Sequence, residues 1–170
     1  MCERSTQHAT RAMNHPPGNT KHVLERITVR LFIAGIMQGS RLDRYIDEQD
    51  YRRAIADVVL AHHPDFEIVD PNELHPNGVD YDDAQAKATL LELADLAGKA
   101  DAVVAFAPKA SMGTAIEMWE GYRAGKTLIT ISPMAANWVV RHLSDVVLPD
   151  LNAFRSWVAD GGLARLLGGE

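Results

Sequence analysis

The chain has 170 residues, of which 46% are hydrophobic and 24% are charged. This is the composition of an ordinary globular domain, and it excludes a chain that is disordered throughout. Acidic residues outnumber basic residues by 23 to 17, which gives a net charge of −6. A nucleic-acid partner would favour a basic surface, so we expect none. No apolar run approaches the ~20 residues that span a bilayer, so we expect no membrane partner either.

The chain holds one cysteine, Cys2, which excludes an internal disulfide and a cysteine zinc cluster. A chain of this kind suits a reducing compartment, and we expect a cytoplasmic protein. Residues 1–26 contain scattered polar residues and two adjacent prolines, without the apolar stretch of a secretory signal. We predict a flexible arm over residues 1–26 and one domain over residues 27–170. The alternative for the arm is a segment that docks on a partner subunit.

Strands and helices alternate from residue 27 onward. A strand over 27–35 is followed by a turn, then by a helix that reaches residue 62 with apolar residues from about 42. A second strand over 66–70 leads through a polar loop, 71–83, to a helix over about 82–99. The later predicted elements are a strand (101–107), a helix (113–124), a strand (127–132), a short helix (135–143) anchored in the core by Trp138, a strand (145–150) and a final helix (151–167).

This alternation predicts a parallel sheet that is covered by helices on both faces. The segments 101–107 and 127–132 lack a clean apolar and polar alternation, as strands buried on both sides do. We therefore predict an α/β fold, a single doubly wound parallel sheet in a flavodoxin-like or Rossmann-like three-layer sandwich. Ligands of such sheets bind beyond the carboxyl ends of the strands. The loops to consider are thus 35–43, 70–82, 107–117 and 132–138.

The first of these loops has the composition of an anion site. Gly35 and Gly39 allow the backbone to approach a ligand closely. Backbone N–H groups near a helix start favour an anion, and Gln38, Ser40 and Arg41 add polar side chains. The loop is neither a P-loop nor a Gly-x-Gly-x-x-Gly motif. The alternative is an ordinary turn between strand and helix, in which Ser40 caps the helix.

The third loop leads from a predicted strand into the helix that carries Glu117. Glu117 is expected about one turn into that helix, close to the carboxyl edge of the sheet. A carboxylate at this place can attack an anomeric carbon, as in retaining glycosidases. The competing interpretation needs no ligand, because Thr114-x-x-Glu117 also fits a capping box. Ser111 and Gly113 precede this motif.

This part of the chain resembles the nucleoside 2-deoxyribosyltransferase-like family, which includes the nucleoside 5′-monophosphate N-glycosidases. The resemblance covers about residues 28–133 and rests on an ordered series of short motifs: Phe32 to Gly35, Ala100 to Val104, Ser111 with Gly113, Glu117, and Gly125-Lys126.

The resemblance implies a flavodoxin-like fold and cleavage of an N-glycosidic bond, by hydrolysis or by deoxyribosyl transfer. Glu117 would be the nucleophile, and Ser111 with Gly113 would bind a 5′-phosphate together with the glycine-rich first loop. It implies a small nucleoside or nucleotide as partner, no metal or organic cofactor, and a homo-oligomer, a dimer or larger.

The sequence departs from the family pattern at three positions. Phe32 stands where the family often has tyrosine, and Leu93 where it uses a catalytic aspartate. Glu92 and Asp83 are the candidates for the missing acid. Trp119 stands where the family commonly has glycine, and it would either stack on a base or fill the pocket.

Two other functions stay open. Gly113-Thr114-x-x-Glu117 is similar to a motif of the lysine-decarboxylase-like phosphoribohydrolases, although Ala110 and Ser111 replace its paired glycines. A catalytically inactive nucleotide-binding sensor or interaction module is the third interpretation, and the departures from the family pattern motivate it. His75 lies in the loop 70–82, where it would either contact a base or sugar or belong to a plain polar loop.

Overall fold

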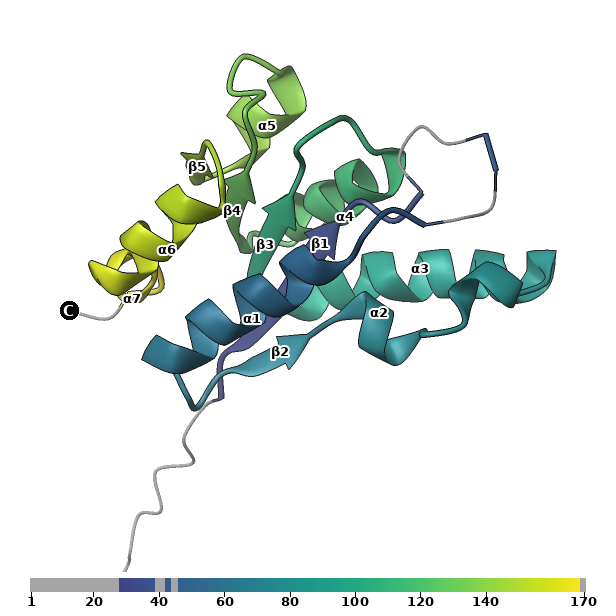
Figure 1. The fold of residues 1–170 in the computed structure, drawn as a ribbon, viewed down its shortest axis with the longest axis horizontal. Coiled ribbons are helices and arrows are strands. Elements are labelled where there is room, and N and C mark those ends of the chain that lie inside the picture. The colour runs from purple at the N-terminus through teal and green to yellow at the C-terminus, as the bar shows by residue number, and fades with distance from the viewer. Residues whose placement is uncertain (1–27, 39–41, 44–45, 169–170) are drawn as a thin grey trace, which may run out of the picture.

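The fold is a three-layer α/β sandwich around one parallel sheet (Figure 1). The computed structural model describes residues 28–38, 42–43 and 46–168. The sheet has the order β2-β1-β3-β4-β5, and every neighbouring pair is parallel. The strands are β1 (Arg30–Gly35), β2 (Glu67–Val69), β3 (Ala102–Phe106), β4 (Thr127–Ile131) and β5 (Val146–Leu148). This is the flavodoxin-like strand order, so the predicted fold class is confirmed.

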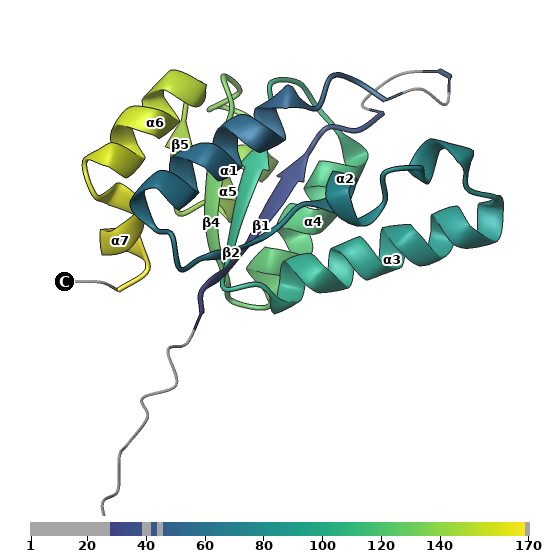
Figure 2. The same cartoon turned by 60° about the horizontal axis from the view of Figure 1, so that its bottom comes forward.

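Helices cover both faces of the sheet, as Figure 2 shows. One face carries α1 (Asp50–His62), α6 (Leu151–Ala159) and α7 (Gly162–Leu166), and the other carries α3 (Asp83–Lys99) and α4 (Met112–Arg123). Short helices complete the chain: α2 (Pro71–Leu74), the 3-10 helix η1 (Gly78–Asp80) and α5 (Trp138–Leu143). No helix in the described part of the chain is long and apolar enough to cross a membrane.

The two cores follow the pleat of the strands. Leu31 and Ile33 of β1 pack with Ile55 on the α1 side, whereas Phe32 and Ala34 point to the α3 and α4 side. Successive side chains of a strand alternate between the faces, and all four are fully buried here. This burial on both faces explains why the strand sequences show no polar alternation.

Two helices differ from the prediction at their ends. The first helix begins at Asp50 rather than near residue 42, because the preceding segment pairs with the loop that follows β1: Asp47 N–H donates to the carbonyl of Met37 over 2.7 Å. The last predicted helix breaks into α6 and α7 at Gly161, whose φ of 76° is left-handed. Glycine adopts this conformation at little cost, and a helix cannot continue through it.

Two further predictions about local structure are wrong. The loop 71–83 contains α2, whose start is fixed by Pro71 in its first turn and by the Asp70 carboxylate, which accepts from Asn72 N–H at 2.9 Å. Trp138 is no core anchor, because its side chain is 81% exposed at the start of α5. The short helix is held instead by its cap, where Asn137 Oδ1 accepts from Val139 N–H at 3.0 Å.

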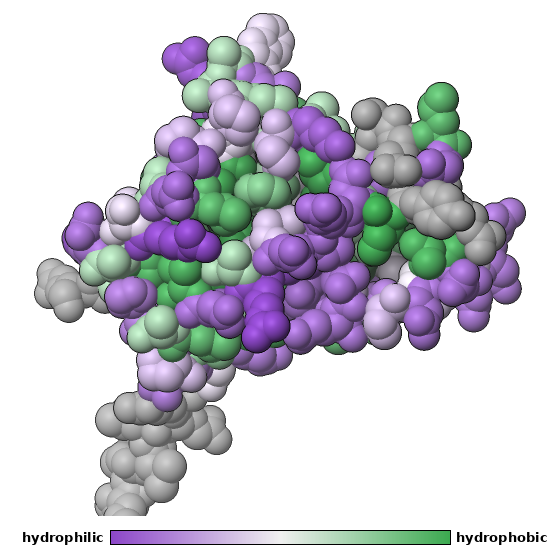
Figure 3. Space-filling model, in the orientation of Figure 1, coloured by the Kyte–Doolittle hydropathy of each residue, from purple (hydrophilic) through white to green (hydrophobic). Residues whose placement is uncertain are grey.

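The view in Figure 3 shows a mainly hydrophilic surface over α2 and α3, with hydrophobic residues visible between α1 and α6. That second region corresponds to a shallow groove of about 700 Å³ between these helices. Its lining is mixed and holds charged residues of both signs, including Asp57 and Arg155. It lies away from the carboxyl edge of the sheet, where ligands of doubly wound folds bind.

Candidate active site

A cavity of about 370 Å³ lies at the carboxyl edge of the sheet. Its walls come from the end of β1 and the following loop, from the segment between α2 and α3, from α3 and from the start of α4. Three of the four loops singled out in the sequence therefore meet here, and the loop 132–138 does not. The predicted site residues that line the cavity are Gly35, Gln38, Ser111, Gly113 and Glu117. Gly39, Ser40 and Arg41 lie outside the described residues.

Glu117 is the carboxylate at the centre of this site. Its side chain is only 8% exposed, and its buried Oε2 has no hydrogen-bond partner among the described residues. Burial raises the pKa of Glu117, while the charge of Arg52 and a backbone hydrogen bond from Gly35 lower it, and the result is about 8. Desolvation of the charged form accounts for the upward shift. Glu117 thus lines the cavity and keeps one buried, unpartnered oxygen.

The structure removes the competing explanation for Glu117. The N-cap of α4 is Ser111 and not Thr114. Ser111 Oγ accepts from Thr114 N–H at 3.4 Å, which places Thr114 inside the helix. Glu117 then lies beyond the position that a capping-box acid occupies, so the capping box is wrong. Nothing in the helix start requires a glutamate at this position.

Arg52 is the site residue that sequence reasoning missed. It is 2% exposed beneath the cavity, and its Nη1 donates to the carbonyl of Ile33 at 2.7 Å and to Asp70 Oδ1 at 3.3 Å. Its Nη2 donates to the carbonyl of Gly35 at 3.3 Å. A guanidinium fork suits such buried multiple bonding. One cation therefore fixes the carboxyl end of β1 and acts on Glu117 electrostatically.

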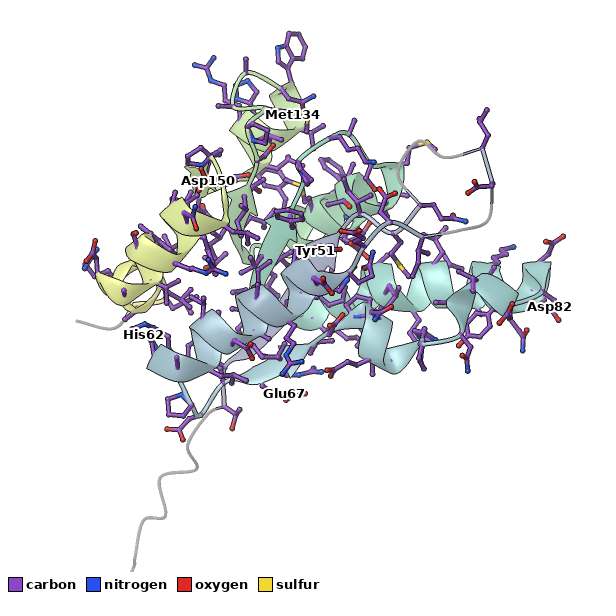
Figure 4. The ribbon with its side chains drawn as sticks, viewed as in Figure 1. Tyr51, His62, Glu67, Asp82, Met134 and Asp150 are labelled. Carbon is purple, nitrogen blue, oxygen red and sulfur yellow. The ribbon has the colours of Figure 1, made fainter. Side chains whose placement is uncertain are left out.

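Tyr51 supports the same strand end from the neighbouring position on α1. Figure 4 places it at the start of α1, beside the carboxyl ends of β1 and β3. Its ring stacks on Phe106 with centroids 4.4 Å apart, and its hydroxyl donates to the carbonyl of Ile36 at 3.2 Å. Burial raises the pKa of Tyr51, so the phenol stays neutral. A Cβ on Gly35 would overlap the Tyr51 hydroxyl, which explains a glycine there.

The loops around the cavity are tied together by a surface ion pair. Lys109, which follows β3, lies with its Nζ 2.7 Å from Asp47 Oδ2 in the segment that precedes α1. Gln49 Nε2 in the same segment donates to the carbonyl of Ile36 at 3.0 Å. These contacts hold the described part of the first loop against the third loop. No group of three or more His, Cys, Asp or Glu side chains among the described residues could hold a metal ion.

The remaining sequence candidates lie outside the cavity wall. Phe32 is fully buried in the core. Trp119 is 48% exposed and stacks on Tyr122, with centroids 6.0 Å apart, so the structure does not bring it to the site. Asp83 begins α3 and is exposed, at the end of the helix where Figure 4 shows Asp82. None of these three residues lines the cavity.

On α3, Leu93 stands at the position where an acid was expected, and Glu92 is its neighbour in the sequence. Leu93 lines the cavity, whereas the Glu92 side chain is 55% exposed and lies beside it. Glu92 Oε2 is 3.5 Å from His75 Nε2, and His75 is itself a cavity residue. Of the two candidate acids, the structure therefore connects Glu92 to the site, through His75.

No protein-family model matches the sequence, and no curated protein is significantly similar to it. Solved structures share its fold. A 2-deoxyribosyltransferase of Bacillus psychrosaccharolyticus is 16% identical with a TM-score of 0.57, over 75% of this chain and 90% of that chain. A conserved protein of Enterococcus faecalis is 15% identical with a TM-score of 0.56, over 79% and 99%. A CMP N-glycosidase of Clostridium botulinum is 18% identical with a TM-score of 0.47, over 76% and 98%.

The likeness to the first two structures confirms, at the level of the fold, the resemblance inferred from the sequence. At such identities a common fold does not establish a common activity. The chain is similar in architecture to a nucleoside 2-deoxyribosyltransferase.

Proposed function

We propose that the protein cleaves the N-glycosidic bond of a nucleoside or nucleoside 5′-monophosphate, with Glu117 as the nucleophile. The observation that carries this proposal is the buried carboxylate of Glu117, with one unpartnered oxygen, in the cavity at the carboxyl edge of the sheet. A solved 2-deoxyribosyltransferase has the same fold, which supports the proposal by analogy.

The reaction has two steps. Glu117 Oε2 attacks C1′ of the sugar, the bond from C1′ to the base nitrogen breaks, and the base leaves with the bonding electron pair. Water or a second base then attacks C1′ of the glycosyl ester and releases the carboxylate. Arg52 favours the ionised carboxylate, and Leu93 and Ile116 give the cavity apolar walls.

The start of α4 is the proposed place for the 5′-phosphate. Ser111 and Gly113 line the cavity there, next to Gln38 from the first loop. A Cβ at Gly113 would meet no atom within 4 Å, so this wall has open space. The helix start provides N–H groups and a positive dipole end for an anion.

Two substitutions of Ser111 can distinguish its proposed role in phosphate binding from its role as the N-cap of α4. Aspartate caps a helix about as well as serine, but its charge would repel a phosphate. We expect Ser111→Asp to raise KM for a nucleoside monophosphate at least about 10-fold, or ~1.4 kcal/mol, with little change for the nucleoside. Steady-state kinetics on both substrates measure this. Ser111→Ala is the control for the cap, and should cost about 1 kcal/mol in unfolding free energy. Equal KM changes for both substrates would contradict the phosphate role.

We also propose that the protein works as a homo-oligomer. The first half of α3 extends beyond the sheet (Figure 2), and its apolar residues Leu90 and Leu91 are 46% and 60% exposed. Met112, Ile116 and Trp119, spaced by four and three residues on α4, are also exposed. Large exposed apolar areas of this kind mark interfaces.

We expect light scattering coupled to size-exclusion chromatography to give a dimer or larger for the wild type and a monomer for Leu91→Glu. A charge at the centre of an apolar interface would be desolvated without a partner, which is costly. Leu60→Glu on α1 is the matched control, because Leu60 is 38% exposed outside the α3 and α4 surface. A monomeric wild type would refute the assembly.

The experiment that tests the function is a chromatographic base-release assay. The substrates are ribo- and deoxyribonucleoside monophosphates and their nucleosides, alone and with a free acceptor base. Release of a base supports the proposal, and a newly formed nucleoside in the acceptor tubes identifies a transferase. Thermal stabilisation by one nucleotide without turnover would favour the sensor.

A further inference from the structure

His75 lines the same cavity as Glu117 but comes from a different part of the chain. It follows α2, and its side chain is only 16% exposed. The ring is held by Tyr81, whose hydroxyl lies 3.1 Å from His75 Nδ1 and whose own ring contacts it edge to face at 5.8 Å. Tyr81 also lines the cavity. Two contacts from one neighbour thus fix the orientation of the imidazole.

The second nitrogen of this ring has no hydrogen-bond partner within the part of the chain that the structure describes. His75 Nε2 is buried and makes no hydrogen bond among the described residues. Glu92 Oε2 lies 3.5 Å away, close enough to stabilise a positive ring but without hydrogen-bond geometry. His63 Nε2 is also buried and unpartnered, but His63 forms no part of the cavity wall. Among the histidines that the structure describes, His75 therefore combines an unpartnered nitrogen, a fixed ring and a ligand-sized cavity.

Cleavage of an N-glycosidic bond also requires a proton for the departing base, which Glu117 does not supply while it acts as the nucleophile. The departing base carries the bonding electron pair and is a poor leaving group until it gains a proton. The charged or titratable side chains that face His75 are Tyr81, Glu92 of α3, and Glu117 of α4 across the same cavity. The imidazole of His75, held at the cavity wall with its Nε2 unpartnered, is the described group placed to supply that proton.

We propose that His75 protonates the leaving base, an inference that rests on the proposed function. As the bond from Glu117 Oε2 to C1′ forms and the bond from C1′ to the base nitrogen breaks, the proton on Nε2 passes to the base. The base leaves neutral and the imidazole becomes neutral. In the second step a water molecule attacks C1′, its proton returns to Nε2, and the Glu117 carboxylate is released. Glu92 stabilises the imidazolium between turnovers.

The test compares two leaving groups in His75→Gln. One substrate is the nucleotide or nucleoside that the wild type cleaves fastest, and the other is the corresponding 4-nitrophenyl glycoside, whose leaving group needs no proton. We expect kcat for base release to fall at least about 100-fold, while nitrophenolate release stays within about threefold. Glu92→Gln should show the same selectivity with a smaller loss. His63→Gln is the matched control and should leave both rates unchanged.

Each other outcome overturns the inference in a distinguishable way. Equal losses for both leaving groups would mean that His75 only shapes the cavity, and an unchanged rate of base release would mean that it transfers no proton. Circular dichroism and thermal unfolding of His75→Gln check that the variant is folded, and His75→Asn provides a second variant. If the wild type released neither leaving group, the proposed function would fall and the inference with it.

Discussion

Replacing Glu117 by glutamine should abolish turnover while leaving the fold intact. An amide cannot form the glycosyl ester, so we expect base release to fall at least about 1000-fold, or ~4 kcal/mol of transition-state stabilisation. The same base-release assay measures it. Glu120→Gln is the matched control, because Glu120 lies on the same helix, is half-buried and pairs with Arg123 at 3.5 Å. Comparable activity of wild type and Glu117→Gln would exclude Glu117 as nucleophile.

The same substitution should stabilise the protein at alkaline pH. Glu117 has a pKa of about 8 in the folded state, against an ordinary value of 4.5. The folded state therefore holds a proton that the unfolded state has lost, and stability falls as pH rises from about 4.5 to 8. Glutamine does not titrate. We expect Glu117→Gln to unfold at a higher temperature than the wild type at pH 9, with the gap closing near pH 5.

The pH dependence of activity should show a rising limb that belongs to Glu117. The nucleophile must be ionised, so kcat/KM should rise about tenfold for each pH unit up to about 8. Loss of the Arg52 charge removes an influence that lowers this pKa. We therefore expect Arg52→Met to move the limb to higher pH, and Arg52→Lys, which keeps the charge, to move it less.

Arg52→Met should also lose stability, because Asp70, 3.3 Å from Arg52, loses its ion-pair partner within a buried setting, and Arg52→Lys should lose less. Removal of one member of a buried ion pair typically costs 3–5 kcal/mol, or about half the stability of a domain. Rates are therefore compared after denaturant titration of each variant. Arg53→Met is the matched control, since Arg53 is 89% exposed next to Arg52. An unshifted limb in folded Arg52→Met would contradict the electrostatic role.

The sheet could be predicted from the sequence because each strand is a short apolar run with a clear end. β1 stops at Gly35, and β2 is followed by Pro71. Parallel strands bring their carboxyl ends to one edge, which is why Gly35 and Glu117, far apart in the chain, could be assigned to one site. The start of α1 was harder to predict, because Ile46 fits helical spacing although its segment pairs with the loop that follows β1.

The parts of the site that were missed depend on tertiary contacts. Arg52 is an example, because it shares the helical spacing of Ile55 and Val59, both fully buried. That spacing was a usable signal. The capping box at Thr114 was the competing interpretation for the start of α4, because serine and threonine are both favoured N-cap residues. His75 gave no periodic signal, since it lies between two short helices.

The most direct test of the central claim is mass spectrometry of the protein quenched during turnover. A 2-fluoro-2-deoxy analogue of the cleaved substrate is a suitable probe, because the fluorine slows hydrolysis of a glycosyl ester and lets it accumulate. We predict an intact mass increased by one sugar or sugar phosphate, and a fragment spectrum that places the adduct on Glu117. Base release without such an adduct, or an adduct on another residue, would contradict the account.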